Sequence, residues 1–320
     1  MTKLIVDGLA FAFPLFIIAI GGIYSERSGI TNLALEGLLG FGAFFGALAV
    51  VLLQIGAPDL IAKYGIYLAM IFAMIGGMLF AIIHGVLCVV FKANQVISGV
   101  VINILSVSLT EFLTRQINLQ VFNGPSNKFQ LGVSPRYSVP VLSEIPVLGG
   151  LFKDIYPFTI GIILVAFLCY YILEKTTFGM RLRAAGDNPH AVDAAGADVS
   201  KIRFFAVLIS GALSGLGGIS FAYSISANFS GSVYSGFGYL AIAALIFGNW
   251  KIKPTLFAAL LFGFARSGGY YLAQVLKMDA SFSDIIMILP YVLTLILLVF
   301  FSKNNRPPRA LGEIYDKGKR

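Results

Sequence analysis

A small set of ionisable and amide side chains interrupts the long apolar stretches of this 320-residue sequence. An acidic group at the centre of a membrane helix costs about 2.5 to 3.5 kcal/mol on insertion scales, so each one needs a structural or functional reason. Such groups mark a translocation path, a proton relay or a polar contact between helices. The set comprises Asp7, Glu36, His84, Asn94, Gln95, Asn103 and Glu111.

Four polar side chains near residue 100 are candidates for a translocation path: Asn94, Gln95, Ser98 and Asn103. Positions 95, 98 and 103 recur at near-helical spacing, which predicts one polar stripe on a helix. A stripe of this kind lines a path or bonds to neighbouring helices, and the spacing favours neither interpretation.

Three other groups point to structural roles. His84 is the one histidine at membrane depth, which favours a neutral, hydrogen-bonded side chain over a proton carrier. Glu111 precedes Arg115 by four residues, a spacing that predicts a local ion pair. His190 lies in a polar loop without a second ligand nearby, so we expect it to be solvated.

The sequence lacks the motifs of soluble catalytic sites. It contains no GxxxxGK[ST] loop to cradle ATP phosphates, and neither HExxH nor GxSxG. Cys88 and Cys169 lie inside apolar runs, which disfavours a disulfide framework or a thiolate metal site. We therefore expect no catalytic residue, metal or cofactor in this chain.

The composition predicts a membrane protein. Only 12% of the residues are charged, about half the roughly 25% of a soluble domain, and 58% are apolar. Mean hydropathy is +0.87. The net charge of +8 is not gathered on one polar face, which favours membrane lipid over nucleic acid as its partner.

Nine apolar runs predict about nine membrane helices, with a range of eight to ten. A bilayer core about 30 Å thick needs about 20 helical residues. One run is short and another is long, so either could change the count. This pattern predicts a single all-α polytopic domain over residues 1–320. The runs span residues 4–24, 33–54, 64–91, 95–113, 157–173, 203–225, 238–249, 254–275 and 284–301.

The basic residues predict the orientation, because cytoplasmic loops hold the excess of lysine and arginine. This excess lies in residues 174–203 and in the tail at 302–320, which are separated by four runs. Both segments are therefore expected in the cytoplasm, together with Lys92, and the N-terminus outside. The proline-rich connection at 114–156 is then extracytoplasmic.

Residues 174–203 carry more local structure than a tether needs. Asn188 and Pro189 together predict a helix start, and Gly196 can end that helix in a left-handed conformation. Most apolar residues of this short helix are alanines, which bury little area in a bilayer. A groove on a protein partner is the expected binding site.

Glycine spacing predicts close helix packing. Gly42 and Gly46, like Gly211 and Gly215, form GxxxG pairs, and Gly218 extends the second pair. Small residues of this kind let membrane helices approach closely. We favour packing over ligand contact for Gly211, Gly215 and Gly218.

Four passages resemble the permease subunits of ABC importers of the branched-chain amino acid, simple-sugar and nucleoside group. SERSGITNLALEG, at residues 25–37, looks like the signature that follows the first core helix of the nucleoside branch. TTFGMRLRAAGDNPHAVDAAGADVSKIR, at 176–203, looks like the ATPase-coupling loop. SGALSGLGG at 210–218 and GFGYLAIAALIFGNWKIKP at 236–254 are similar to the glycine-rich helix and to a segment ending in an inward turn.

The resemblance implies a permease that works by alternating access in the bacterial cytoplasmic membrane. Two permeases, two cytoplasmic ABC ATPases, which bind the ATP, and an extracytoplasmic substrate-binding lipoprotein would act together. The chain begins close to the first core helix, whereas the sugar branch has an additional one. This favours the shorter permease of a nucleoside importer, paired with a longer related permease.

The resemblance also implies roles for individual residues. Asn32 and Glu36 would brace an interruption of the membrane helices or line the path. The residues expected to engage the ATPase are Gly179, Arg181, Gly186, Asn188, Pro189, Ala191, Ala194, Ala195 and Gly196.

Other functions are weighed against this one. A simple-sugar or branched-chain amino acid importer is the alternative within the family. An ATPase-independent secondary transporter or channel needs intramembrane carboxylates or charged rings, and only Asp7 and Glu36 qualify. The structured loop at 174–203 disfavours a membrane scaffold.

Overall fold

The computed structural model describes residues 2–132, 136–140, 143, 153–231, 236–277, 288–301 and 305–318. Parts of the predicted outer connection lie outside the described residues. The same is true of the start of the ninth apolar run and of Lys303, Lys319 and Arg320 in the tail.

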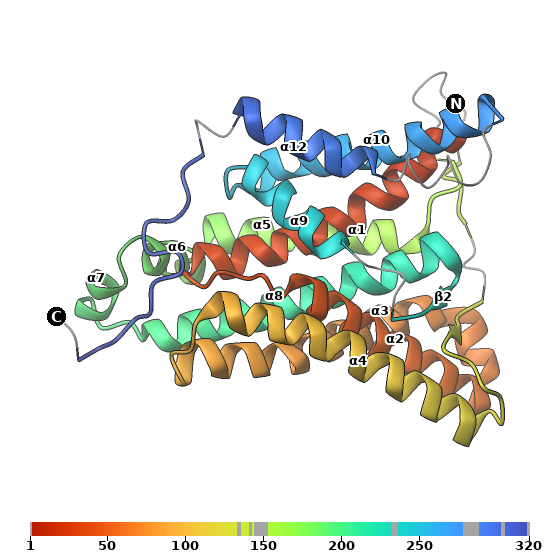
Figure 1. Ribbon diagram of the computed structural model, residues 1–320, viewed down its shortest axis with the longest axis horizontal. Helices are drawn as coiled ribbons and strands as arrows, with labels where there is room; N and C mark the ends of the chain where they lie inside the picture. The colour runs from red at the N-terminus through yellow and green to blue at the C-terminus, as the bar shows by residue number, and fades with distance from the viewer. Residues whose placement is uncertain are drawn as a thin grey trace.

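The described chain is almost entirely helical (Figure 1). The long helices are α1 (Thr2–Arg27), α2 (Leu35–Gly56), α3 (Pro58–Gly85), α4 (Gln95–Val121), α5 (Pro157–Lys175), α8 (Val199–Phe221) and α10 (Ile252–Val275). The shorter helices are α6 (Thr177–Asp187), α7 (Pro189–Ala194), α9 (Phe237–Phe247) and α12 (Leu289–Phe301). Two π-helical turns, η1 (Val86–Val90) and η4 (Ala222–Ser226), extend α3 and α8, and β1 (Phe129–Gln130) pairs antiparallel with β2 (Asn228–Phe229).

The predicted all-α polytopic architecture is confirmed. Within the described residues, seven helices are long and apolar enough to cross a membrane. The shorter helices α9 and α12 occupy the two remaining apolar runs. The long run at 64–91 forms one helix that ends in a π-helical turn, so it contributes a single span.

Helix α8 lies at the centre of the bundle and packs against α1, α2 and α3 (Figure 1). A Cβ built at Gly215 would lie 2.1 Å from the carbonyl oxygen of Ala73, and one at Gly211 would lie 2.3 Å from that of Gly77. A Cβ at Gly218 would lie 2.2 Å from a carbonyl oxygen of α2. The glycines of α8 therefore let its backbone touch two neighbouring helices.

The chain termini lie at opposite ends of the bundle (Figure 1). The end that carries the C-terminus also holds Lys92, α6, α7 and the turn between α9 and α10. Contacts with residues 305–318 hold these segments together, including an ion pair of 2.8 Å between Lys92 and Asp316. We call this end of the bundle the tail end.

Replacing Gly215 with alanine is expected to destabilise the protein by about 1 to 3 kcal/mol, because the added methyl group overlaps the backbone of α3. The matched control is Gly268→Ala in α10, where a Cβ meets nothing within 4 Å. Without a clash, alanine gains roughly 0.5 to 1 kcal/mol over glycine within a helix. Thermal unfolding in detergent should lower the midpoint of the first variant only, and equal midpoints would contradict the close packing.

Candidate functional site

The first two helices are interrupted by a non-helical segment. Helix α1 ends at Arg27 and α2 begins at Leu35, so residues 28–34 form a break, as expected from the sequence. The break turns at Gly29, whose φ of +98° suits glycine. Backbone polar groups at membrane depth have no water to bond, so the surrounding protein must satisfy them.

Side chains of α4 bond to backbone groups of this break and of the first turn of α2. Gln95 accepts a hydrogen bond from the Thr31 N–H at 2.7 Å through its Oε1 atom. Asn103 donates to the Leu33 carbonyl at 2.8 Å and accepts from the Gly37 N–H at 2.7 Å. Two members of the predicted stripe, Gln95 and Asn103, therefore face the break.

Asn32 fastens the middle of the break to α8. Its amide nitrogen donates to the Ser210 hydroxyl at 2.8 Å, and its side-chain oxygen accepts from the Ala34 N–H at 3.2 Å. Asn32 is fully buried. It therefore braces the interruption from inside the bundle.

Two further stripe residues have local partners. Asn94 is exposed and caps α4, because its side-chain oxygen accepts from the N–H groups of Val96 and Ile97. Ser98 lies 2.8 Å from the Nδ1 atom of the buried His84. The predicted hydrogen-bonded role of His84 is confirmed.

Glu36 connects α2 to the start of α9. Its two carboxylate oxygens accept hydrogen bonds from the N–H groups of Gly236 and Gly238, each at 2.6 Å. These N–H groups have no partner within the helix, and the positive end of the helix dipole favours a carboxylate there. Glu36 therefore holds the short helix α9 against the end of the break.

A cavity of about 440 Å³ lies beside this junction. Among the residues predicted for the path, Glu36 and Asn103 line it, whereas Asn32, Asn94, Gln95 and Ser98 do not. Its lining residues are Glu36, Gly40, Asn103, Ile104, Ser106, Val107, Ser108, Thr110, Gly231 and Tyr239.

Sequence reasoning missed several of these polar lining residues. Ser106 and Thr110 follow Asn103 at helical spacing, so the stripe could have been extended to them. Tyr239 had no such signal, since it lies in an apolar run 136 residues away. Its hydroxyl accepts a hydrogen bond from Asn103 at 3.0 Å.

The predicted short helix at the tail end is present as α7. Asn188 caps it by accepting from the Ala191 N–H at 3.0 Å, and Gly196 has a φ of +80°. Asp198 then caps α8 through the Lys201 N–H at 3.0 Å. This hydrogen bond holds the pKa of Asp198 below its ordinary value, so its carboxylate is charged at neutral pH.

The residues predicted to engage an ATPase fall into two groups. Gly179, Gly186 and Pro189 are buried, and a Cβ at Gly186 would lie 2.1 Å from the carbonyl oxygen of Arg27. Gly179 packs against the end of α5, and Gly186 packs against the end of α1. The exposed group comprises Arg181, Asn188, Ala191, Ala194, Ala195 and Gly196.

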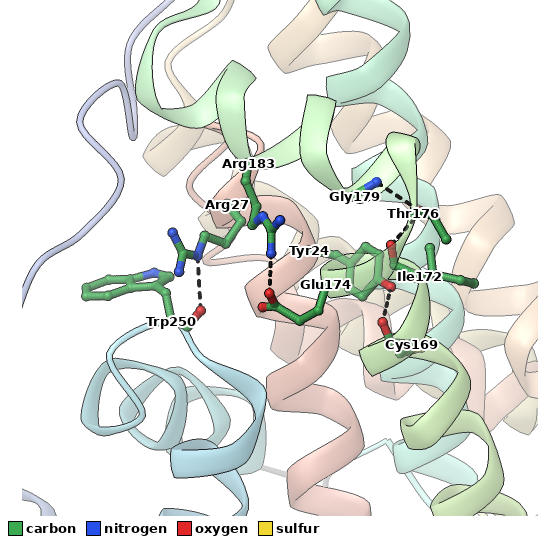
Figure 2. A network of polar contacts seen from close by, with 9 residues as sticks. All are labelled: Tyr24, Arg27, Cys169, Ile172, Glu174, Thr176, Gly179, Arg183 and Trp250. Carbon is green, nitrogen blue, oxygen red and sulfur yellow. Dashed lines mark hydrogen bonds and ion pairs between the residues drawn. The ribbon is translucent and has the colours of Figure 1, made fainter.

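Figure 2 shows how the end of α1 is held beside this loop. The Tyr24 hydroxyl donates to the Cys169 carbonyl at 2.6 Å, and the Arg27 Nε atom donates to the Trp250 carbonyl at 3.0 Å. Arg183 of α6 pairs with Glu174 of α5. The start of the break is therefore fixed to α5 and to the turn after α9.

One expectation about charged groups fails, and one partly buried charged residue was not anticipated. No ion pair joins Glu111 and Arg115 among the described residues, so that prediction is wrong. Both side chains are exposed, and Glu111 leans towards Gly231 instead. Arg266 was overlooked, although it interrupts an apolar run. It lies over the Phe11 ring at 4.4 Å and lines a second cavity of about 350 Å³.

The described residues contain no group of three His, Cys, Asp or Glu side chains suited to a metal ion. The arrangement beside the break instead offers amide, hydroxyl and carboxylate groups around a hollow. Such a hollow can hold a small polar molecule.

Replacing Asn103 with alanine is expected to destabilise the protein by about 1 to 3 kcal/mol, because it leaves backbone groups of Leu33 and Gly37 unsatisfied in a buried site. Ser108→Ala is the control, since Ser108 lies on the same helix and lines the same cavity but is exposed. Thermal unfolding in detergent compares the two. A wild-type midpoint for the Asn103 variant would show that the break does not depend on this side chain.

Comparisons with known proteins agree with this architecture. Residues 4–300 match the family model described as the permease component of the branched-chain amino acid transport system. The guanosine ABC transporter permease protein NupQ of Bacillus subtilis is 38% identical over 98% of this chain and 96% of its own length. The nucleoside ABC transporter permease protein NupC of Lactococcus lactis is 36% identical over 99% and 97%, respectively.

The nucleoside ABC transporter permease protein NupB of Lactococcus lactis is 26% identical over 80% of this chain and 69% of its own length. No solved structure matches the chain significantly. In this family the permease forms the membrane component, and ATP hydrolysis resides on a separate ATPase subunit. The chain therefore belongs to the ABC transporter permeases of the branched-chain amino acid transport family, as a multi-pass membrane protein.

Proposed function

We propose that this permease moves a nucleoside into a bacterial cell across the cytoplasmic membrane. Two relatives named for guanosine and nucleoside transport align with almost the whole chain, at 38% and 36% identity, which supports this substrate class. The chemistry of the cavity beside the break is the structural observation that carries the proposal.

The cavity suits an uncharged molecule with hydroxyl groups and a ring. Its lining includes the exposed ring of Tyr239, together with the Asn103 amide and the Ser106 and Thr110 hydroxyls. The amide and the two hydroxyls are buried and also bond within the protein, so a ligand would share them. Hydroxyl and amide groups can bind a ribose, and an aromatic face can stack on a nucleobase. Its volume of about 440 Å³ lies within the range of ligand pockets, roughly 300 to 1,000 Å³.

The translocation path is proposed to run through this cavity. Glu36 and Asn103 contact the substrate, whereas Asn32 and Gln95 brace the backbone of the break. Ser98 contacts His84, and Asn94 caps the start of α4. Contact between polar groups and lipid is energetically unfavourable, so the open side of the cavity must be covered by protein. A second, related permease supplies that cover.

A heterodimer of permeases is supported by the relatives from Lactococcus lactis. NupC and NupB are both named nucleoside permeases, yet they are 36% and 26% identical to this chain. The chain covers 97% of NupC but only 69% of NupB, as expected for a shorter and a longer permease.

The tail end is proposed to face the cytoplasm, where α7 seats in a groove of the ABC ATPase. The exposed alanines Ala191, Ala194 and Ala195 present a smooth surface for that contact, and Arg181 lies exposed on α6. ATP is bound by the ATPase, and this chain binds no cofactor. The opposite end, with the N-terminus and the β1–β2 pair, then faces the substrate-binding lipoprotein.

Alternating access fits the two interruptions beside the cavity. The break and the short helix α9 meet at Glu36, so a movement of either changes the shape of the cavity. The glycine surface of α8 lets neighbouring helices rock without clashes between side chains.

A simple-sugar substrate is the second candidate, because the same hydroxyl and amide groups bind any polyol. A branched-chain amino acid is disfavoured. Its carboxylate would need a cationic partner, and the described lining residues include one carboxylate and no lysine or arginine.

Replacing residues 188–196 with a flexible glycine-serine linker of equal length should reduce co-purification of the ATPase about tenfold or more. Every 1.4 kcal/mol of lost contact energy weakens binding tenfold. The control is the same replacement at residues 123–127, at the opposite end of the bundle. A linker variant that still assembles and transports would remove the coupling role of α7.

Replacing Tyr239 with alanine should lower nucleoside uptake by about tenfold, because base stacking on an aromatic ring contributes roughly 1 to 3 kcal/mol. Tyr239→Phe keeps the aromatic ring, so uptake should fall less in this variant than in Tyr239→Ala. Phe257→Ala, at a 72% exposed position, is the control. Uptake of guanosine, ribose and leucine into proteoliposomes measures the choice of substrate, and transport of leucine alone would contradict it.

A further inference from the structure

Residues 305–318 cross the tail end of the bundle without regular secondary structure, and we call them the strap. They contact segments that are far apart in the sequence. The hydrogen bonds of the strap join Arg306 N to Asn249 Oδ1 at 2.8 Å, Ala310 N to Gly186 O at 2.8 Å, Gly312 N to Gly29 O at 3.0 Å, Arg203 Nη1 to Glu313 O at 2.8 Å and Lys92 Nζ to Asp316 Oδ1 at 2.8 Å.

The end of the strap contacts the coupling helix α7. The Tyr315 ring lies 5.4 Å from the His190 ring, between centroids, and Lys317 lies 3.5 Å from the Asp193 carboxylate. His190 and Asp193 both belong to α7. The helix is therefore attached to the bundle by a second connection besides its own flanking chain.

Arg203 joins the strap to the break. Its Nε atom donates to the Ser28 carbonyl at 3.0 Å, and its Nη1 atom donates to the Glu313 carbonyl at 2.8 Å. The side chain is only 2% exposed. Beside it, a Cβ at Gly29 would lie 2.5 Å from the guanidinium, so this turn has room only for glycine.

Burying a guanidinium is unfavourable unless hydrogen-bond acceptors surround it. In the described part of the chain no carboxylate lies within ion-pair distance of Arg203, and its Nη2 atom has no hydrogen-bond partner. Moving the strap away from the break would remove the Glu313 carbonyl from the buried Arg203 guanidinium and leave its charge with fewer acceptors. The strap and the break are therefore expected to move as one unit.

The same unit reaches the cavity. The Ser28 carbonyl, which Arg203 holds, lies four residues before Asn32 and eight before Glu36. Asn32 fastens the break to α8, and Glu36 lines the cavity and holds α9. Contacts thus run from α7 through the strap and Arg203 to Ser28, and the backbone of the break continues from there to the proposed substrate site.

We propose that the strap, with Arg203 as its positioning residue, transmits the movement of α7 to the break and so couples ATP hydrolysis to the opening of the cavity. This inference rests on the proposed contact between α7 and the ATPase. It adds a second route of coupling, through the C-terminal segment, to the direct connection from α7 into α8.

The test uses the complete importer in proteoliposomes and measures nucleoside uptake per ATP hydrolysed. Arg203→Gln should lower this ratio by about tenfold while the ATPase stays bound, in the usual range of coupling between sites. Arg203→Lys keeps the charge but not the forked geometry, so its uptake per ATP should lie between that of the wild type and that of Arg203→Gln. Lys201→Gln, two residues earlier on α8 and exposed, is the matched control.

A second variant tests the strap even if Arg203→Gln fails to fold. Tyr315→Ala combined with Lys317→Ala removes the side-chain contacts with α7 but leaves the main-chain bonds of the strap intact. It should lower the ratio by about fivefold, whereas Ile314→Ala, at an exposed position, should not.

The outcomes separate this inference from the proposed function. A wild-type ratio in the Tyr315 and Lys317 double variant would overturn the role of the strap, even if Arg203→Gln failed to fold. Failure of the wild-type chain to bind an ATPase would overturn the proposed function instead.

Discussion

The hydrogen bonding of the break is the constraint on which the rest of the structure depends. Seven residues outside the helices lie between α1 and α2, and most of them are buried, so an unsatisfied backbone group there is destabilising. Gln95 and Asn103 of α4, together with Asn32 and Ser210, supply the partners that water cannot. That requirement explains these buried polar side chains before any role in transport is considered.

The short helix α9 is a second irregular feature that meets the break beside a cavity. Glu36 follows the break directly and binds the N–H groups that begin α9, so the two irregular segments share one junction. A hollow lined by hydroxyl and amide groups lies beside it. Irregular backbone at membrane depth occurs where protein or a cavity surrounds it, which is the case here. The tail end connects to the start of the break, at Ser28, through Arg203.

Local sequence signals predicted those parts of the fold that depend on local interactions. The order of the apolar runs follows from hydropathy, and the cap at Asn188 and the end at Gly196 follow from backbone chemistry within a few residues. The break was expected from the likeness of residues 25–37 to a known signature. The prediction of an ion pair between Glu111 and Arg115 was wrong, because helical spacing permits such a pair without requiring it.

What the sequence by itself determined is a membrane protein of about nine helices with a structured, partly basic loop, since composition, periodicity and capping need no knowledge of distant contacts. Only the tertiary structure decided which polar residues face the cavity. Tyr239 meets Asn103 across 136 residues, and Arg203 reaches Glu313 across 110. The physical reason is that the role of a buried polar group depends on the partner that folding brings within about 3 Å. The spacing of residues in the sequence does not identify that partner.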